Sequence, residues 1–399
     1  MQYDFDETID RSQNYAAKIE EAHLHYGTND VIPLWIADMD FRTAQPIIDA
    51  IKKRADQGIF GYTYRPDAYF QTIADWQQER NGYMPDLSKM AFSSGVVPAM
   101  RMFLNLFTKP GDKILIQQPV YHPFEDIVRN TGRTLVVNEL VRDENGFYTM
   151  DLEDFEKKLA SGVKYVIFCN PHNPVGRVWT KAELLRMGGI CAEYGTGILS
   201  DEIHSDLMLG DNKHTVMASV SPEIGALTTT FIAPSKTFNL AGLQSSTIIF
   251  DTVDRKDAYV AELKQMDIAR NNCFSLVASM AAYTEGAEWL SQLLPYIREN
   301  MRFIQAYCSQ YIPVLKPNDP QATYLNWIDA RGLGLSDDEL KRFMVEKAGV
   351  AMNSGADFGQ GGSGFLRMNA ACPRITLEKA LKRIQAAIDS LQTLAIETN

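Results

Sequence analysis

The feature that most constrains the fold of this chain is an alternation of short apolar runs with longer amphipathic stretches. The runs are of strand length and rich in Val, Ile, Phe or Thr. Amphipathic helix patterns, such as residues 152–160 and 181–195, lie between several of them. This alternation predicts a mostly parallel sheet whose two faces are buried by helices. The predicted strands are residues 90–94, 113–117, 134–140, 164–170, 196–202, 228–233 and 246–250.

The pattern changes after about residue 285. Long amphipathic stretches then surround one short strand candidate at 322–328, and a helical pattern fills the C-terminal tail. A chain of 399 residues is long enough for two or three folding units. We therefore predict a large α/β domain over residues 50–285 and a smaller α+β domain built from residues 1–49 together with 286–399.

Charge and cysteine pattern argue against several classes of protein. The chain has 39 Lys and Arg against 50 Asp and Glu, a formal charge of −11, which is unfavourable for binding a nucleic-acid backbone. Its five cysteines are scattered without a CxxC, so neither a disulfide framework nor a thiolate metal site is predicted. The N-terminal residues do not resemble a signal peptide, and no apolar run approaches the length of a membrane span. We expect a cytoplasmic protein that binds neither nucleic acid nor membranes.

Two candidate groups follow predicted strands, at the place where open α/β sheets bind their ligands. Lys236 follows the run 228–233. Burial there would lower its pKa and make it a base or a Schiff-base nucleophile, while a solvated strand end is the plain alternative. Asp201 lies at the end of another run, 196–202, and His204 follows that run. A buried carboxylate there needs a partner such as a protonated ring nitrogen. A metal held by Asp201, His204 and Asp206 is the weaker alternative, because no further histidine cluster completes such a site.

Three more candidates lie at strand ends. The backbone amides around Gly95, Val96 and Val97 open a predicted helix and could hold an anion, or form an ordinary turn. Tyr121 lies between two prolines, a stiff turn that could hold an aromatic ring against a flat ligand or against the core. Two Asn-Pro steps fix an extended turn and could leave the amide of Asn173 in a cleft.

Arg367 stands in the run 364–371, which has no other charge. The planar fork of arginine suits the carboxylate of a substrate, and a structural salt bridge is the alternative. Far upstream, Tyr62 and Tyr64 cluster with an arginine in the loop 61–66.

Taken in order, Asn-Pro-His-Asn-Pro-x-Gly, Asp-x-x-His, Ser-Lys-Thr-Phe-Asn and a C-terminal Arg resemble the motifs of the class I/II aminotransferase superfamily, the fold-type-I pyridoxal-phosphate enzymes. The resemblance covers essentially the whole chain. It implies the PLP-dependent transferase fold, with a mostly parallel seven-stranded sheet between helices in the large domain and a smaller α+β domain. The stretches 35–41, 60–64, 94–99, 201–204 and 233–244 are most similar to the MalY/PatB-type cystathionine and cysteine-S-conjugate β-lyases.

The resemblance implies a role for each candidate that would face the cofactor ring. Lys236 would bond covalently to pyridoxal 5'-phosphate, and Asp201 would pair with its pyridine nitrogen. Tyr121 would stack on the ring, while Asn173 and His204 would approach the 3'-oxygen. No metal is implied.

The phosphate would lie on the backbone amides that follow Gly95, those of Val96 and Val97, with help from Tyr62 of the neighbouring subunit of a homodimer. The active sites would therefore lie at the subunit interface. The chain departs from mainstream aminotransferases here, because Ala233 and Gln244 replace a phosphate-binding serine and arginine, so that Ser235 is expected to take part instead. The substrate would contact Arg367 through its α-carboxylate, and also Ala37, Asn173 and Tyr64.

The implied activity is a C–S β-lyase. Lys236 would remove the α-proton, and a thiolate would leave from the β-carbon of L-cystathionine, another cysteine S-conjugate or L-cysteine, giving a thiol, pyruvate and ammonia. An aminotransferase is the alternative, because Lys236 and Asp201 serve both reactions. Members of this group also restrain a transcription activator, so a regulatory partner is a second alternative. The cofactor-binding half of a transcription regulator is not expected, because the chain starts at the enzyme's own N-terminal segment.

Overall fold

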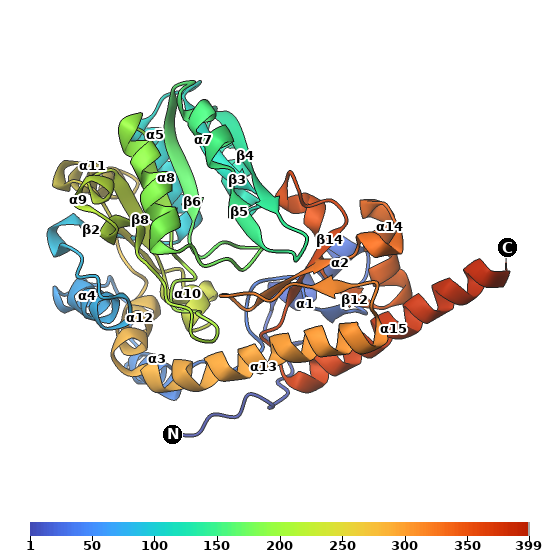
Figure 1. The fold of residues 1–399 in the computed structure, drawn as a ribbon. Coiled ribbons are helices and arrows are strands. Elements are labelled where there is room, and N and C mark those ends of the chain that lie inside the picture. The colour runs from blue at the N-terminus through green and yellow to red at the C-terminus, as the bar shows by residue number, and fades with distance from the viewer. Residues whose placement is uncertain (398–399) are drawn as a thin grey trace.

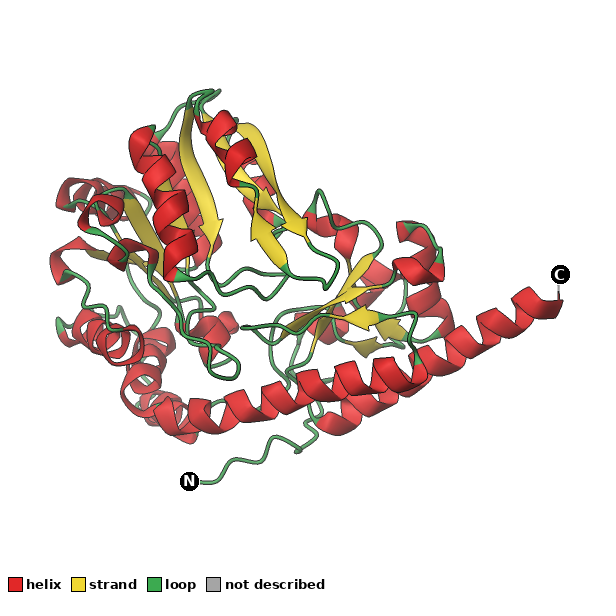
Figure 2. Cartoon of the chain, in the orientation of Figure 1, coloured by secondary structure: helices red, strands yellow, loops and turns green. Residues whose placement is uncertain are grey.

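The computed structural model describes residues 1–397 and has two groups of strands surrounded by helices (Figures 1 and 2). The larger group is an eight-stranded sheet, in which five neighbouring strands run parallel and the strands at the edges run antiparallel to their neighbours. In spatial order the strands are β2 (Met90–Ser93), β9 (Ser246–Ile249), β8 (Thr228–Ile232), β7 (Gly197–Asp201), β6 (Val163–Cys169), β3 (Lys113–Gln118), β4 (Thr134–Arg142) and β5 (Tyr148–Met150).

The seven predicted strands are confirmed, and the mostly parallel sheet with them. The eighth strand, β5, was not predicted, because three residues are too few to show an alternating pattern. It pairs antiparallel to the end of β4 and so lengthens the sheet at one edge.

Helices bury both faces of this sheet, as the apolar runs predict. Successive residues of a strand point to opposite faces, so Ile114 and Ile116 of β3 join one core cluster while Leu115 joins the other. The helices contributing to the first cluster are α5 (Val96–Phe107), α6 (Pro123–Asn130) and α11 (Val253–Gln265), and those contributing to the second are α7 (Leu152–Leu159), α8 (Lys181–Glu193) and α9 (Pro222–Gly225).

Side-chain caps place the start of the helices that follow the strands. At α7, the Asp151 side chain accepts a hydrogen bond from the backbone of Asp154. At α8, Thr180 and Glu183 form a reciprocal capping box. Both helices therefore begin where the sequence pattern predicts, at residues 152 and 181.

The smaller group of strands contains segments from both ends of the chain. An antiparallel four-stranded sheet has the order β10 (Lys316–Pro317), β11 (Leu325–Asp329), β14 (Phe365–Asn369) and β13 (Asn353–Ser354). Beside it, β1 (Ile32–Pro33) pairs in parallel with β12 (Val350–Ala351), which ties the N-terminal residues to the C-terminal part.

Most of the remaining helices contribute to a third core cluster, which also contains residues of the smaller group of strands. The longest, α13 (Ala287–Tyr311), extends from the end of α12 to the smaller strand group (Figure 1). Residue 50, the predicted domain boundary, lies inside α3, which packs on α12. Within residues 1–397 no helix is both long and apolar enough to cross a membrane. The other helices are α1 (Ala17–Glu20), α2 (Ala22–Tyr26), α3 (Gln45–Asp56), α4 (Ala68–Asn81), α10 (Pro234–Thr237), α12 (Cys273–Glu285), α14 (Asp337–Arg342) with a π-helical turn after it, and α15 (Arg374–Glu397).

Candidate active site

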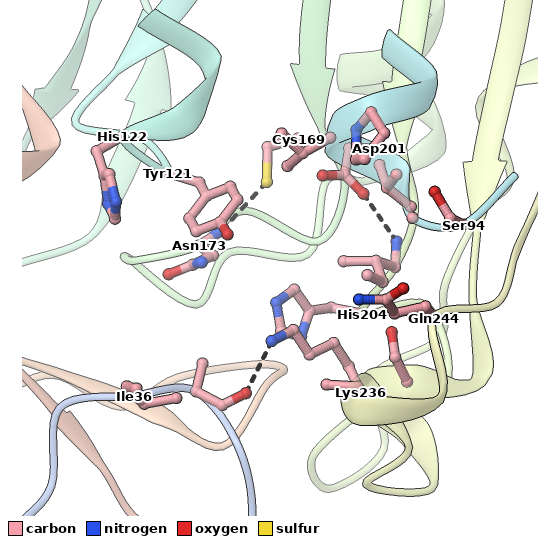
Figure 3. A pocket seen from close by; sticks show the side chains of 18 of the residues that line it. Ile36, Ser94, Tyr121, His122, Cys169, Asn173, Asp201, His204, Lys236 and Gln244 are labelled. Carbon is pink, nitrogen blue, oxygen red and sulfur yellow. Dashed lines mark hydrogen bonds between the residues drawn. The ribbon is translucent and has the colours of Figure 1, made fainter. Parts of the chain in front are cut away.

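A cavity of about 330 Å³ lies at the carboxyl ends of the parallel strands (Figure 3). This is the edge at which open α/β sheets bind their ligands, because the loops after the strands diverge there. The structure brings eleven of the predicted site residues together in its lining. These are Ala37, Gly95, Val96, Val97, Tyr121, Asn173, Asp201, His204, Ser235, Lys236 and Arg367.

Lys236 lies in the short helix α10, which follows β8, and points into the cavity (Figure 3). Its Nζ donates a hydrogen bond of 2.7 Å to the backbone oxygen of Ala37. Desolvation, and after it the nearby Arg367, lowers the pKa of this ammonium to about 8, against the opposing effects of Asp38 and Asp201. A useful fraction of this lysine is therefore a neutral amine at neutral pH.

Asp201 is the last residue of β7 and is buried. Its Oδ1 accepts a hydrogen bond of 3.1 Å from the backbone of Ile203. Burial raises the pKa of Asp201 to about 7, although that hydrogen bond and Lys236 act to lower it. No cation forms an ion pair with this carboxylate in the part of the chain that the structure describes. A positively charged group of a ligand would supply the missing partner.

Arg367 of β14 closes the opposite side of the cavity and is also buried. Its terminal nitrogens donate to the side chains of Asn173 (3.2 Å) and Asn353 (2.7 Å) and to the backbone oxygen of Trp35 (3.1 Å). Its Nε has no partner, and among residues 1–397 no carboxylate forms an ion pair with it. Burial lowers the pKa of this guanidinium to about 10. A buried cation with a free donor and no acid beside it suits the carboxylate of a ligand.

Tyr121 and His204 supply two of the rings that line the cavity. The backbone of Tyr121 donates to the backbone oxygen of Asn173, so the turn after β3 is tied to the turn after β6. Burial raises the pKa of the Tyr121 hydroxyl. Burial lowers the pKa of His204 to about 3, with Lys236 and Arg367 acting in the same direction, so this imidazole is neutral. Its buried Nδ1 has no hydrogen-bond partner within the protein, which leaves it free for a ligand atom.

One end of the cavity is suited to an anion, although no lysine or arginine among the described residues lines that end. Helix α5 begins at Val96 directly after Gly95, without a side-chain cap, so its first amides are free. Ser235, Gln244 and Ser245 line the same cavity. The only lysine and arginine in the lining are Lys236 and Arg367.

Tyr62 and Tyr64 lie outside this cavity in the single chain. Their exposed fractions are 97% and 75%. The guanidinium of Arg270 lies 5.8 Å from the centre of the Tyr62 ring and donates a hydrogen bond to the backbone oxygen of Thr63.

Sequence reasoning missed the residues that hold Ala37 in place. The hydroxyl of Tyr324 donates a hydrogen bond of 2.8 Å to the Ala37 oxygen that also accepts from Lys236. Asn239 binds the backbone of Met39 at both its nitrogen and its oxygen. Asn369 donates to the backbone oxygens on either side of Ala37, at 2.7 Å and 2.5 Å. Asn239 lies three residues after Lys236, and Asn369 lies two residues after Arg367. This closeness to predicted site residues was the only signal in the sequence that could have identified them.

A buried charge cluster, formed by Arg11, Lys18, Asp38 and Asp40, lies behind the same segment. The Lys18 side chain is fully buried, and its Nζ lies 2.9 Å from Asp40 and 3.4 Å from Asp38. Arg11 bridges the same two carboxylates. These ion pairs fix the residues that flank Ala37.

The metal alternative is not supported by the geometry. Asp206 lies behind the cavity, where its carboxylate accepts from Trp76 Nε1 (2.9 Å) and from the Thr237 hydroxyl (2.8 Å). Within the described residues, no three His, Cys, Asp or Glu side chains are arranged to hold a metal ion.

Comparison with known proteins places this fold and cavity in a family. The model of the aminotransferase class I and II family matches residues 29–384. The chain belongs to this family.

Individual proteins are also similar to this chain over nearly its full length. Cystathionine beta-lyase PatB of Bacillus subtilis (strain 168) is 42% identical over 96% of this chain and 99% of its own length. Cystalysin of Treponema denticola, solved with a pyridoxal 5'-phosphate cofactor, is 34% identical with a TM-score of 0.94, over 98% of this chain and 100% of that one. The PLP-bound C-S lyase of Staphylococcus hominis is 31% identical with a TM-score of 0.91, over 97% of this chain and 98% of that one.

Proposed function

We propose that this protein is a pyridoxal-phosphate-dependent C–S β-lyase, which cleaves L-cystathionine or other cysteine S-conjugates, L-cysteine included, to a thiol, pyruvate and ammonia. The observation that carries the proposal is the convergence of Lys236, Asp201 and Arg367 on one cavity, none of them with an ion-pair partner there. The names of the full-length relatives point to the same reaction.

The cavity fits the cofactor at each of its polar positions. Asp201, a buried acid without a cation, would hold the protonated pyridine nitrogen. Asn173 and the free Nδ1 of His204 would lie toward the 3'-oxygen, and Tyr121 would cover the ring. The helix amides at Val96 would take the phosphate, together with the neighbouring Gly95, Val97 and Ser235. When bound, the cofactor supplies an electron sink that stabilises the negative charge left on the α-carbon.

Lys236 would carry the proton that leaves the α-carbon. Its lowered pKa, about 8, makes the neutral amine accessible at neutral pH, as a general base requires. The hydrogen bond to the Ala37 oxygen fixes the direction of the Nζ. Asp201 would stay ionised while its positive partner is beside it, because the paired charges stabilise each other.

Arg367 would orient the substrate. Two of its nitrogens are held by the side chains of Asn173 and Asn353, which leaves the free Nε for the α-carboxylate. Fixing the carboxylate places the α-carbon between Arg367 and Lys236, and the group on the β-carbon toward the open side of the cavity.

The acidity of the leaving group's conjugate acid favours loss of a thiolate over loss of hydroxide. The bond between the β-carbon and sulfur breaks with its electron pair on sulfur, and hydrolysis of the remaining three-carbon unit gives pyruvate and ammonia. A thiolate leaves more readily than hydroxide, because its conjugate acid, a thiol, is a far stronger acid than water.

The site is further proposed to be completed in a homodimer, with Tyr62 and Tyr64 of one subunit reaching the cavity of the other. The loop at 59–64 supports this idea, because Ile59 and Phe60 are also strongly exposed, at 74% and 60%. Light scattering should give twice the chain mass of 44.9 kDa. A monomer with full activity would contradict the proposal.

Two wider expectations accompany this function. The division into a large domain at 50–285 and a small domain from 1–49 and 286–399 remains a proposal, which limited proteolysis would examine. The cytoplasmic location also remains a proposal, for cell fractionation to examine. The alternative regulatory role, restraint of a transcription activator, and the expected absence of nucleic-acid binding are likewise proposals.

The test is to supply the purified, cofactor-loaded protein with L-cystathionine and no 2-oxo acid. Sustained release of thiol and pyruvate in equal amounts is the expected result. Turnover that begins only when a 2-oxo acid is added would replace the lyase with an aminotransferase, the function after which the family is described.

A further inference from the structure

A second cavity, here called the outer groove, opens beside the active-site cavity and has a volume of about 530 Å³. The two cavities share Trp35, His122 and Asn353 in their linings. Trp35 and Asn353 are also hydrogen-bond partners of Arg367, through the backbone oxygen and the side chain. The outer groove therefore adjoins the residues that hold the guanidinium proposed to bind the substrate carboxylate, and a substrate too long for the first cavity would extend into it.

The outer groove has carboxylates without partners. Asp126 and Asp357 line it, and neither side chain makes a hydrogen bond or an ion pair with another residue in the described range 1–397. Glu125 also lines the groove, but its two oxygens are taken by Arg129 (2.7 Å) and Gln118 (2.9 Å). The free negative charge of the groove thus belongs to the two aspartates.

Basic groups among the described residues form no ion pair with the two aspartates, although the buried Arg367 beside the inner end of the groove attracts Asp357. Lys341 is the only lysine or arginine in the lining, and its ammonium lies 5.4 Å from the centre of the Tyr26 ring, in a cation–π contact. His122 lies at the junction of the two cavities, where burial and then Arg367 lower its pKa, so its imidazole is neutral at pH 7. The His25 ring packs against Trp35, with ring centres 4.8 Å apart.

We propose that the outer groove binds the part of the substrate beyond the sulfur, and that Asp126 and Asp357 select S-conjugates that carry a protonated amine there. This inference rests on the proposed lyase function. Both aspartates are exposed, so the attraction is screened by water and salt and is expected to change specificity several-fold rather than decide whether reaction occurs.

Two substrates of nearly equal shape isolate this effect, S-(2-aminoethyl)-L-cysteine and S-propyl-L-cysteine. The selectivity ratio is kcat/KM for S-(2-aminoethyl)-L-cysteine divided by kcat/KM for S-propyl-L-cysteine. Because the released thiols differ in acidity, the informative quantity is the change in this ratio between wild type and a variant. We expect the ratio to fall about fivefold in the Asp126→Asn, Asp357→Asn double variant. Asp211→Asn, which removes an exposed carboxylate from a turn that lines neither cavity, is the matched control and should leave the ratio unchanged.

A second measurement needs no variant. In the wild-type protein, raising the salt concentration should weaken the preference for the aminoethyl compound, because counterions screen the carboxylates. A ratio that is the same in wild type and double variant, and insensitive to salt, would overturn the inference. If S-propyl-L-cysteine gives thiol and pyruvate while the ratio is the same in wild type and double variant, the proposed selectivity of the outer groove is contradicted and the lyase function is not. If neither compound is cleaved by the wild-type protein, the lyase function itself fails.

Discussion

On one wall of the cavity each working side chain lies at or just beyond the end of a strand of the eight-stranded sheet, whereas the opposite wall is assembled from segments far apart in the sequence. Asp201 and Lys236 on the sheet wall lie at or just beyond the ends of β7 and β8. On the opposite wall, Ala37, Tyr324 and Arg367 meet although nearly 300 residues or more separate the first from the other two. The sheet wall is thus fixed by backbone pairing, whereas the Ala37 segment of the opposite wall depends on side-chain contacts as well as on backbone hydrogen bonds at Leu34 and Asp40.

This difference predicts how substitutions affect each wall. Parallel strand pairing holds the ends of β6, β7 and β8 together through many backbone hydrogen bonds, so one substitution changes the chemistry of the sheet wall but not its shape. The segment that carries Ala37 depends on Asn239, Asn369 and the Lys18 cluster. Substitutions in those residues should displace the opposite wall without touching a reacting atom.

The largest loss of stability is expected from Lys18→Met. It leaves Asp38 and Asp40 with Arg11 as their only cation, and breaking a buried ion pair by removing one partner costs about 3 kcal/mol or more of unfolding free energy. Denaturant unfolding measures this loss. Lys53→Met on the exposed side of α3 is the control and should stay near the wild-type value. Equal stabilities of the two variants would show that the charge cluster does not hold the opposite wall.

Asp201→Asn should lower kcat about 100-fold without unfolding the protein. A neutral amide cannot stabilise a protonated ring nitrogen, while burial of an amide costs less than burial of a carboxylate whose pKa is already raised to about 7. Steady-state kinetics and a melting curve measure the two effects. Asp201→Glu, which keeps the charge but moves it by one methylene, should lose less activity than the amide. An Asp201→Asn enzyme with the wild-type kcat would contradict the proposed role of this residue.

The sheet wall was predictable from the sequence and the opposite wall was only partly so. Apolar runs identify the strands, and polar residues placed directly after them, such as Asp201 and Asn173, must gather at one sheet edge. Arg367 was predicted from its charge in an apolar run. Tyr324 was not, because an aromatic residue in a predicted strand is usually a core residue, and only the folded chain brings its hydroxyl to Ala37. Lys18 likewise shows no pattern in sequence that distinguishes it from a surface lysine.

Arg367→Gln should raise KM about 30-fold, because the substrate carboxylate loses a charge-assisted hydrogen bond. Its stability should be retained, since the guanidinium has no acid partner among the described residues and its burial is already unfavourable. Initial rates over a range of substrate concentrations measure the change. Arg367→Lys, which keeps the charge but loses the planar fork, should fall between wild type and Arg367→Gln. An unchanged KM in both variants would show that the substrate carboxylate binds elsewhere.

The smallest effect concerns the electrostatic influence of the opposite wall on the sheet wall. Because the pKa of Lys236 is about 8, the rate at which cofactor-free protein captures pyridoxal phosphate should rise with pH through that value, as the amine loses its proton. Asp38 raises this pKa, so Asp38→Asn should move the midpoint to lower pH. Asp56→Asn at the exposed end of α3 is the control and should leave it in place. A midpoint at the ordinary lysine value of about 10.4 would mean that Lys236 is solvated.

The most direct measurement of the proposed mechanism is rescue of Lys236→Ala by a small amine. Without added amine, thiol release from L-cystathionine should fall about 1,000-fold or more, because the base that takes the α-proton is missing. Adding ethylamine should restore the release of thiol and pyruvate in proportion to the concentration of the neutral amine. Unchanged thiol release by Lys236→Ala in the absence of any amine would contradict the assignment of Lys236 and the mechanism built on it.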